Sequence, residues 1–96
     1  MAAYVIVDVT VTDPDLMAKY RELVPATLTK YGGKFVVRGG KHETMEGTWK
    51  PSRVVVLEFP SMDQAKRWYD CEEYKGPRAL RMKAGRTNVV IVEGAP

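Results

Sequence analysis

Residues 53–60, Arg-Val-Val-Val-Leu-Glu-Phe-Pro, constrain the fold of this chain more than any other stretch. Consecutive aliphatic residues closed by Phe59 are typical of a β-strand, and Pro60 ends the strand because proline has no backbone N–H to donate. A strand that is apolar on both faces belongs inside a sheet, with another layer packed above and below it. One of those layers can be the chain's own helices, so the cover of the other face becomes the main question.

The remaining elements follow from periodicity and from capping residues. Residues 4–11 alternate and predict a strand, and Thr12 or Asp13 caps a helix that begins at Pro14. Pro25 predicts a kink or brief break near residues 21–24, and Gly32 and Gly33 end the helix. The other predicted elements are strand 34–38, helix 62–70 behind a Ser61/Gln64 capping box, a break at residues 72–76, a short helix 78–84 that Pro77 opens, and strand 88–93.

This order, β-α-β-β-α-β, predicts an α+β protein with a ferredoxin-like fold. Right-handed crossovers place the helices on one face of a four-stranded antiparallel sheet with strand order 4-1-3-2. We expect a single domain over residues 1–96, since the chain has ordinary domain length and neither a linker nor a repeat.

The face without helices is predicted to be largely apolar. It would carry some of Tyr4, Ile6, Asp8, Val36, Arg38, Val54, Val56 and Glu58, together with one of the two alternating sets of the last strand. The central strand also offers two sets, and we assign Val54, Val56 and Glu58 to this face because the other set, Arg53, Val55, Leu57 and Phe59, contains the bulkier residues that suit packing under helices. At roughly 25 cal/mol per Å², leaving several apolar side chains of the open face in water forgoes about 5–10 kcal/mol. We therefore predict an obligate homodimer in which two sheets pack face to face.

Composition excludes several classes of protein. A single cysteine rules out an internal disulfide, and the absence of a long apolar segment or a leader predicts a cytoplasmic protein without a membrane partner. The central strand lacks the aromatic residues that a nucleic-acid-binding sheet needs. The net charge of +3 is concentrated in a basic run, which favours a solvated helix face, with an anionic ligand as the alternative: Lys75, Arg78, Arg81, Lys83 and Arg86.

Polar residues beside valines suggest either a structural charge network or a ligand pocket. In the pocket interpretation, Asp8 and Arg38 orient the ligand, Glu58 and Tyr31 contribute further polar contacts, and Trp49 in the long connection 41–52 forms part of a lid. His42, the only histidine, and Glu46 are the candidates for proton transfer. No residues have metal-ligand spacing, and no phosphate-cradling glycine motif is present, so neither a metal nor a cofactor is expected.

Several motifs taken together resemble DUF1330, a bacterial family of unknown function. They are residues 4–8, Tyr31-Gly32-Gly33, Arg38-Gly39-Gly40, Glu46-Gly47-Thr48-Trp49, the strand 53–60, and Trp68-Tyr69 with Tyr74 and Arg78. The resemblance implies membership of the dimeric α/β-barrel superfamily, which includes cofactor-free monooxygenases, and it carries over no reaction or catalytic residue. Our leading hypothesis is a small-molecule-binding homodimer, extending to a cofactor-independent enzyme on a small organic or anionic substrate; the alternative is a non-catalytic structural or regulatory dimeric module.

Overall fold

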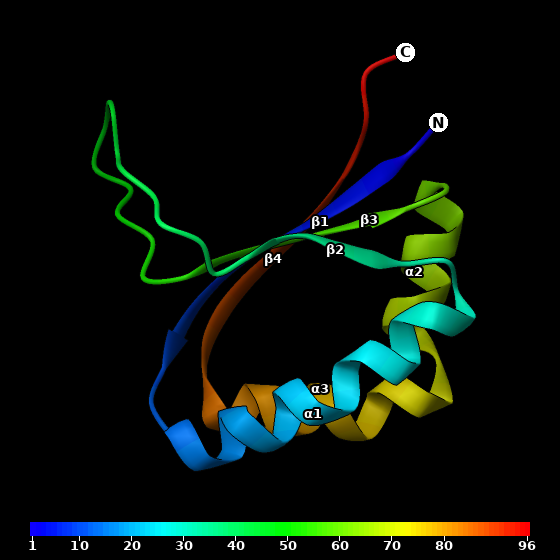
Figure 1. Ribbon diagram of the computed structural model, residues 1–96, viewed down its shortest axis with the longest axis horizontal. Coiled ribbons are helices and arrows are strands. Elements are labelled where there is room, and N and C mark those ends of the chain that lie inside the picture. The colour runs from blue at the N-terminus through cyan, green and yellow to red at the C-terminus, as the bar shows by residue number, and fades with distance from the viewer.

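The computed structural model describes residues 1–96 and confirms the ferredoxin-like plan (Figure 1). The strands form one antiparallel sheet of order β2-β3-β1-β4, which is the predicted order. In chain order the elements are β1 (Ala3–Val11), α1 (Pro14–Lys30), β2 (Lys34–Arg38), β3 (Val54–Phe59), α2 (Met62–Asp70), α3 (Glu72–Ala84) and β4 (Gly85–Glu93).

The predicted caps of α1 and α2 are present. The Asp13 side chain accepts a hydrogen bond from the Leu16 N–H, and the Ser61 side chain accepts one from the Gln64 N–H. Gly32 has a positive φ of 74° after the end of α1, which is the left-handed conformation expected there. The ends of these helices are therefore encoded locally.

Two breaks that proline was expected to cause are absent or lie elsewhere. Helix α1 continues without a break through Pro25, because Val24, Thr27 and Leu28 are buried and their packing outweighs one lost hydrogen bond. The break between α2 and α3 lies at Cys71, whose backbone is extended, rather than at residues 72–76. Helix α3 thus begins at Glu72 and contains Pro77, which is buried.

All three helices lie on one side of the sheet (Figure 1). Residues 39–53, which we call the arm, connect the end of β2 to the start of β3. The arm projects from the sheet and carries no regular secondary structure. The N- and C-termini lie next to one another at the opposite end of the sheet (Figure 1). No helix combines the length and hydropathy that a membrane span requires.

Trp68 of α2 is the centre of the hydrophobic core. Its ring lies 4.1 Å from that of Tyr74 on α3 and 5.3 Å from that of Phe59 on β3, between ring centroids. Its indole N–H donates to the Thr27 hydroxyl of α1 over 3.0 Å. Trp68 of α2 therefore contacts α1, α3 and β3, and its size sets the distance between the helical layer and the sheet.

The second face of the sheet has no cover from this chain. Strand register places Ile6 opposite Val56 and Val90 on this open face, with Tyr4 opposite Glu58 and Val92. Val90 is 57% exposed and Val92 is 43% exposed. The predicted excess of apolar strand surface is present.

Replacing Gly85 with alanine is expected to lower the free energy of unfolding by about 1–3 kcal/mol, as overpacking does. A Cβ at Gly85 would overlap the Thr10 carbonyl oxygen and lie 3.2 Å from the Val11 Cα, so β1 and β4 would have to separate. Urea denaturation measures the change. Gly40→Ala is the control: Gly40 lies on the arm with a φ that is not positive and no atom within 4 Å of its missing Cβ, so alanine should change the free energy of unfolding by less than about 0.5 kcal/mol. Equal stability of Gly85→Ala and the wild type would contradict the close approach.

Candidate functional site

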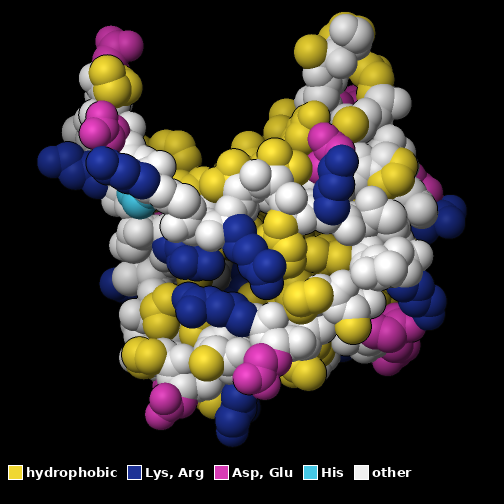
Figure 2. All heavy atoms as spheres, in the orientation of Figure 1, with side chains coloured by type: hydrophobic (Ala, Val, Ile, Leu, Met, Phe, Trp, Pro, Cys, Tyr) yellow, Lys and Arg dark blue, Asp and Glu magenta, His cyan; other side chains and the backbone are white.

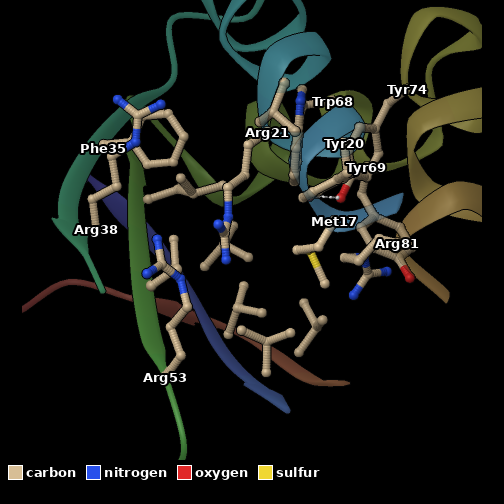
Figure 3. Close-up of a pocket in the computed structure, with 17 residues that line it drawn as sticks. Met17, Tyr20, Arg21, Phe35, Arg38, Arg53, Trp68, Tyr69, Tyr74 and Arg81 are labelled. Carbon is tan, nitrogen blue, oxygen red and sulfur yellow. Dashed lines mark hydrogen bonds between the residues drawn. The ribbon is translucent and has the colours of Figure 1, made fainter. Parts of the chain in front are cut away.

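A cavity of about 60 Å³ lies between the helix-covered face of the sheet and the helices (Figure 3). Hydrophobic residues form most of its wall, and no Asp, Glu, His, Lys or Cys lines it. The lining residues are Val5, Val7, Val9, Met17, Tyr20, Arg21, Val24, Phe35, Arg38, Arg53, Val55, Leu57, Trp68, Tyr69, Tyr74, Arg81 and Val89.

Three arginines from different elements surround the entrance. Arg21 comes from α1, Arg38 ends β2, and Arg53 directly precedes β3, and Figure 3 shows them gathered on one side of the cavity. In Figure 2, Lys and Arg side chains gather beside a hollow with a hydrophobic interior below the arm. None of the three arginines has a carboxylate oxygen within 4.0 Å. We call Arg21, Arg38 and Arg53 the mouth cluster.

A β-bulge puts Arg38 into this cluster. The expectation that Arg38 lies on the open face with Asp8 was wrong, because the register shifts between Phe35 and Val37 and leaves Val36 unpaired. Beyond the shift Arg38 stands opposite Val55, whose side chain lines the cavity. One extra residue in a strand reverses the facing of every residue after it. The Arg38 guanidinium consequently lies 4.1 Å from the centre of the Phe35 ring.

The Arg53 guanidinium lies against the backbone of Gly39, the residue directly after β2. Gly39 has a positive φ of 70°, and a Cβ at that position would overlap the Arg53 guanidinium. Partial burial and the nearby charges of Arg21 and Arg38 lower the pKa of Arg53. The mouth cluster is thus a site of mutual repulsion that no acidic side chain relieves.

Aromatic side chains form the helical side of the cavity. The Tyr20 and Tyr74 hydroxyls lie 2.8 Å apart, and Tyr69 packs against both Trp68 and Tyr74. Burial, with the neighbouring Tyr74 as a second cause, strongly raises the pKa of Tyr20, and burial also raises the pKa of Tyr74. Both hydroxyls stay protonated at neutral pH, so they can donate or accept hydrogen bonds and do not serve as bases.

The structure brings Asp8 and Trp49 together outside this cavity. The Trp49 indole N–H donates to the Asp8 carboxylate over 2.9 Å, which connects the arm to β1 at the open face. Trp49 is otherwise 60% exposed. The pair therefore positions the arm beside the sheet.

His42 and Glu46 lie on the arm. The His42 Nε2 donates to the Pro51 carbonyl over 2.7 Å, and the Thr44 hydroxyl donates to the Trp49 carbonyl over 2.8 Å, so both link the two limbs of the arm. Glu46 is exposed near the end of the arm. A shallow hollow includes His42, Glu46 and Trp49, but neither proton-transfer candidate lines the cavity under the helices.

Glu58 and Tyr31 lie at two further places. Glu58 is on the open face, 3.3 Å from the Lys34 ammonium group, and a hydrogen bond with Glu58 raises the pKa of Tyr4. Tyr31 caps the C-terminus of α1 beside Cys71. The predicted ligand-binding residues are therefore dispersed, and only Arg38 lines the cavity.

Sequence reasoning missed Arg21, Arg53 and Arg81 as lining residues, although two of them carried a signal. Arg53 alternates in phase with Val55, Leu57 and Phe59, which are the residues expected under the helices. Arg21 follows Met17 by four positions and so shares its side of α1. No group of three or more His, Cys, Asp or Glu side chains lies close enough to hold a metal ion.

Comparison with known proteins identifies the family and the fold. The family model described as "Domain of unknown function (DUF1330)" matches residues 2–95, and the chain belongs to this family. No curated protein matches the chain in sequence.

Three solved structures illustrate the similarity in fold. A protein of unknown function from Rhodopseudomonas palustris is 16% identical, with a TM-score of 0.75, covering 99% of this chain and 83% of that chain. SnoaB, a cofactor-independent oxygenase from Streptomyces nogalater, is 11% identical, with a TM-score of 0.68 and coverage of 99% and 94%. A dimeric protein of unknown function with a ferredoxin-like fold, from Bacteroides fragilis, is 16% identical, with a TM-score of 0.62 and coverage of 97% and 96%.

Replacing Arg53 with methionine is expected to raise the free energy of unfolding by about 0.5 kcal/mol, because it removes one of three unpaired like charges and keeps the apolar stem. Added salt should reduce the gain, since it screens the repulsion in the wild type. Urea denaturation at low and high salt measures both effects. Arg67→Met, which removes an exposed arginine paired with Asp63, should give no such gain. Loss of stability in Arg53→Met would show that the cluster is not repulsive.

Proposed function

We propose that this member of the DUF1330 family is a homodimer that binds a small organic anion in the cavity between its sheet and its helices. The mouth cluster carries the proposal: three guanidinium groups converge on an apolar cavity without any carboxylate partner. Arginine side chains present fixed, bidentate donors that suit carboxylate and phosphate groups. An anion at the mouth would relieve the repulsion, and its apolar part would enter the cavity.

The size of the cavity favours a slender ligand. Its volume of about 60 Å³ is less than half of the roughly 150 Å³ that accepts benzene in an engineered protein core. A fused ring system would require the helices to move away from the sheet. A flexible aliphatic acid, with its carboxylate among the arginines at the open end, needs a smaller movement because its chain is narrower than a ring. A tail of five carbons still exceeds the present volume, so the helices would part from the sheet as it enters.

The homodimer is supported by the open face of the sheet. In Figure 2 hydrophobic side chains form the floor of a saddle between the arm and the chain termini. A second sheet bearing the same apolar residues is complementary to this floor, and a two-fold axis would close the assembly. The similar protein from Bacteroides fragilis is described as dimeric. The Asp8–Trp49 contact would then position the arm against the second copy instead of orienting a ligand.

A cofactor-independent reaction is an extension of this proposal. SnoaB is a cofactor-independent oxygenase, and a structure from Nitrosomonas europaea with a TM-score of 0.57 is described as a "Putative antibiotic biosynthesis monooxygenase". The cavity of this chain offers hydrogen-bond donors and no carboxylate or imidazole as a base. A reaction here would rely on a substrate that ionises readily. Proton transfer by His42 or Glu46 stays a prediction from the sequence.

The second candidate function is a dimeric module without a ligand. It is favoured by the polar residues of the open face, which already pair within the chain through Asp8–Trp49 and Glu58–Lys34. The two candidates differ in what the mouth cluster does, because a purely structural dimer gives those arginines no anion to bind.

Hexanoate is expected to bind the protein, and 1-hexanol, an uncharged molecule of the same length, is expected to bind at least about tenfold more weakly, as the loss of a charged hydrogen-bond partner predicts. Replacing Arg38 with glutamine should weaken hexanoate binding by about tenfold or more for the same reason. NMR titration measures both affinities. Lys66→Gln, an exposed position on the outer side of α2, is the matched charge-loss control. Equal binding of the acid and the alcohol, or full affinity in Arg38→Gln, would reject the anion site.

Replacing Val90 with lysine is expected to convert the dimer to a monomer, because it places two charges in an apolar interface. Light scattering coupled to size exclusion should give twice 10.8 kDa for the wild type and 10.8 kDa for the variant. Met82→Lys is the matched control: Met82 is as exposed as Val90, at 57%, but lies on α3 away from the open face. A monomeric wild type at micromolar concentration would contradict the dimer.

A further inference from the structure

Arg81 is the one member of the basic run on and after α3 that lies in the interior. Its side chain is 3% exposed, whereas Lys75, Lys83 and Arg86 are exposed. Helical periodicity explains the difference, because the buried residues of α3 are Tyr74, Pro77, Arg81 and Ala84, at spacings of three and four. The run is therefore not a uniformly solvated face, and one of its charges points toward the sheet.

The Arg81 guanidinium lacks the partners that a buried charge normally has. Its Nη1 donates to the Thr87 hydroxyl over 2.8 Å, while its Nε is buried with no hydrogen-bond partner. No carboxylate oxygen lies within 4.0 Å of it. Burying an unpaired ion costs several kcal/mol in a protein interior. A charge maintained at such a cost, beside a cavity, is suited to an incoming anion.

Arg81 also lines the same cavity as the mouth cluster, on its other side. Figure 3 shows Arg21, Arg38 and Arg53 on one side, Arg81 on the other, and Met17 between them. The sheet contributes valines to the wall of the same cavity, among them Val7, Val9 and Val89. The cavity is thus cationic at both ends and apolar in the middle.

We propose that Arg81 is a second, internal anion-recognition point, and that the ligand is a linear dicarboxylate whose two carboxylates are separated by an apolar chain. One carboxylate would lie at the mouth cluster, and the other would accept hydrogen bonds from the Arg81 Nε and a terminal nitrogen. Because the cavity is about 60 Å³ and the Nε is buried, the helices would part from the sheet to admit the diacid and to expose this nitrogen. This inference rests on the proposed function and names the substrate class of the same cavity. The Tyr20–Tyr74 pair gives the inner end one further hydrogen-bond donor, because one of the two protonated hydroxyls already donates to the other.

The test compares α,ω-dicarboxylates of about four to ten carbons with monocarboxylates of equal length, by calorimetry on the wild-type protein. For at least one chain length, the diacid should bind at least about tenfold more tightly than the monoacid of equal length. This difference corresponds to about 1.4 kcal/mol of binding free energy. Arg81→Gln should remove this preference while monoacid affinity stays within about twofold. Lys83→Gln, an exposed charge loss on the same helix, should preserve the preference.

A direct readout is the Nε–H resonance of Arg81, assigned through its disappearance in Arg81→Gln. Adding the preferred diacid should shift this resonance, and adding the matched monoacid should not. If monoacids bind and no diacid binds better at any length, the internal site is rejected while the anion cavity stands. If neither series binds, both proposals fail. Should Arg81→Gln fail to fold, the comparison on the wild-type protein decides alone.

Discussion

A four-stranded sheet that is apolar on both faces requires cover on both, and this requirement organises the whole molecule. The chain supplies one cover from α1, α2 and α3, with Trp68 fixing their distance from β3 through its contacts with Phe59, Tyr74 and Thr27. The other face remains open between the arm and the termini. The cavity and the proposed interface are therefore on opposite sides of the same strands, so one sheet supports a binding site and an assembly surface without either occupying the other.

The cavity gains its cationic character from backbone geometry as much as from composition. The bulge at Val36 reverses the facing of Arg38, and Gly39 leaves the room that the Arg53 guanidinium fills. Arg21 reaches the same entrance from α1. Each arrangement brings like charges together in a partly dry place, which lowers stability unless an anion compensates. Arrangements that reduce stability in the absence of a ligand are a mark of functional sites.

Arg81 extends the same principle into the interior. Its position on the buried side of α3 is set by helical periodicity, and Thr87 satisfies only part of its hydrogen-bonding capacity. Leucine or methionine at this position would pack against Met17 and the tyrosines without a desolvation cost. The presence of an arginine there, at the far end of a cavity that begins with three others, is what distinguishes this site from an ordinary gap between a sheet and its helices.

The sequence by itself determined the order of the strands, through the β-α-β-β-α-β succession and the handedness of its crossovers. It also determined the caps at Ser61 and Gly32 and the excess of apolar strand surface, because these depend on residues that are neighbours along the chain or alternate regularly, and it left the cap of α1 between Thr12 and Asp13. Alternation with Val55 and Leu57 also assigned Arg53 to the helix-covered face. The tertiary structure alone decided the membership of the site. A bulge, which has no clear local signature here, turned Arg38 away from Asp8, and packing against the core kept α1 helical through Pro25. The convergence of Arg21, Arg38, Arg53 and Arg81 on one cavity follows from contacts between distant segments, and periodicity within one segment contains no information about them.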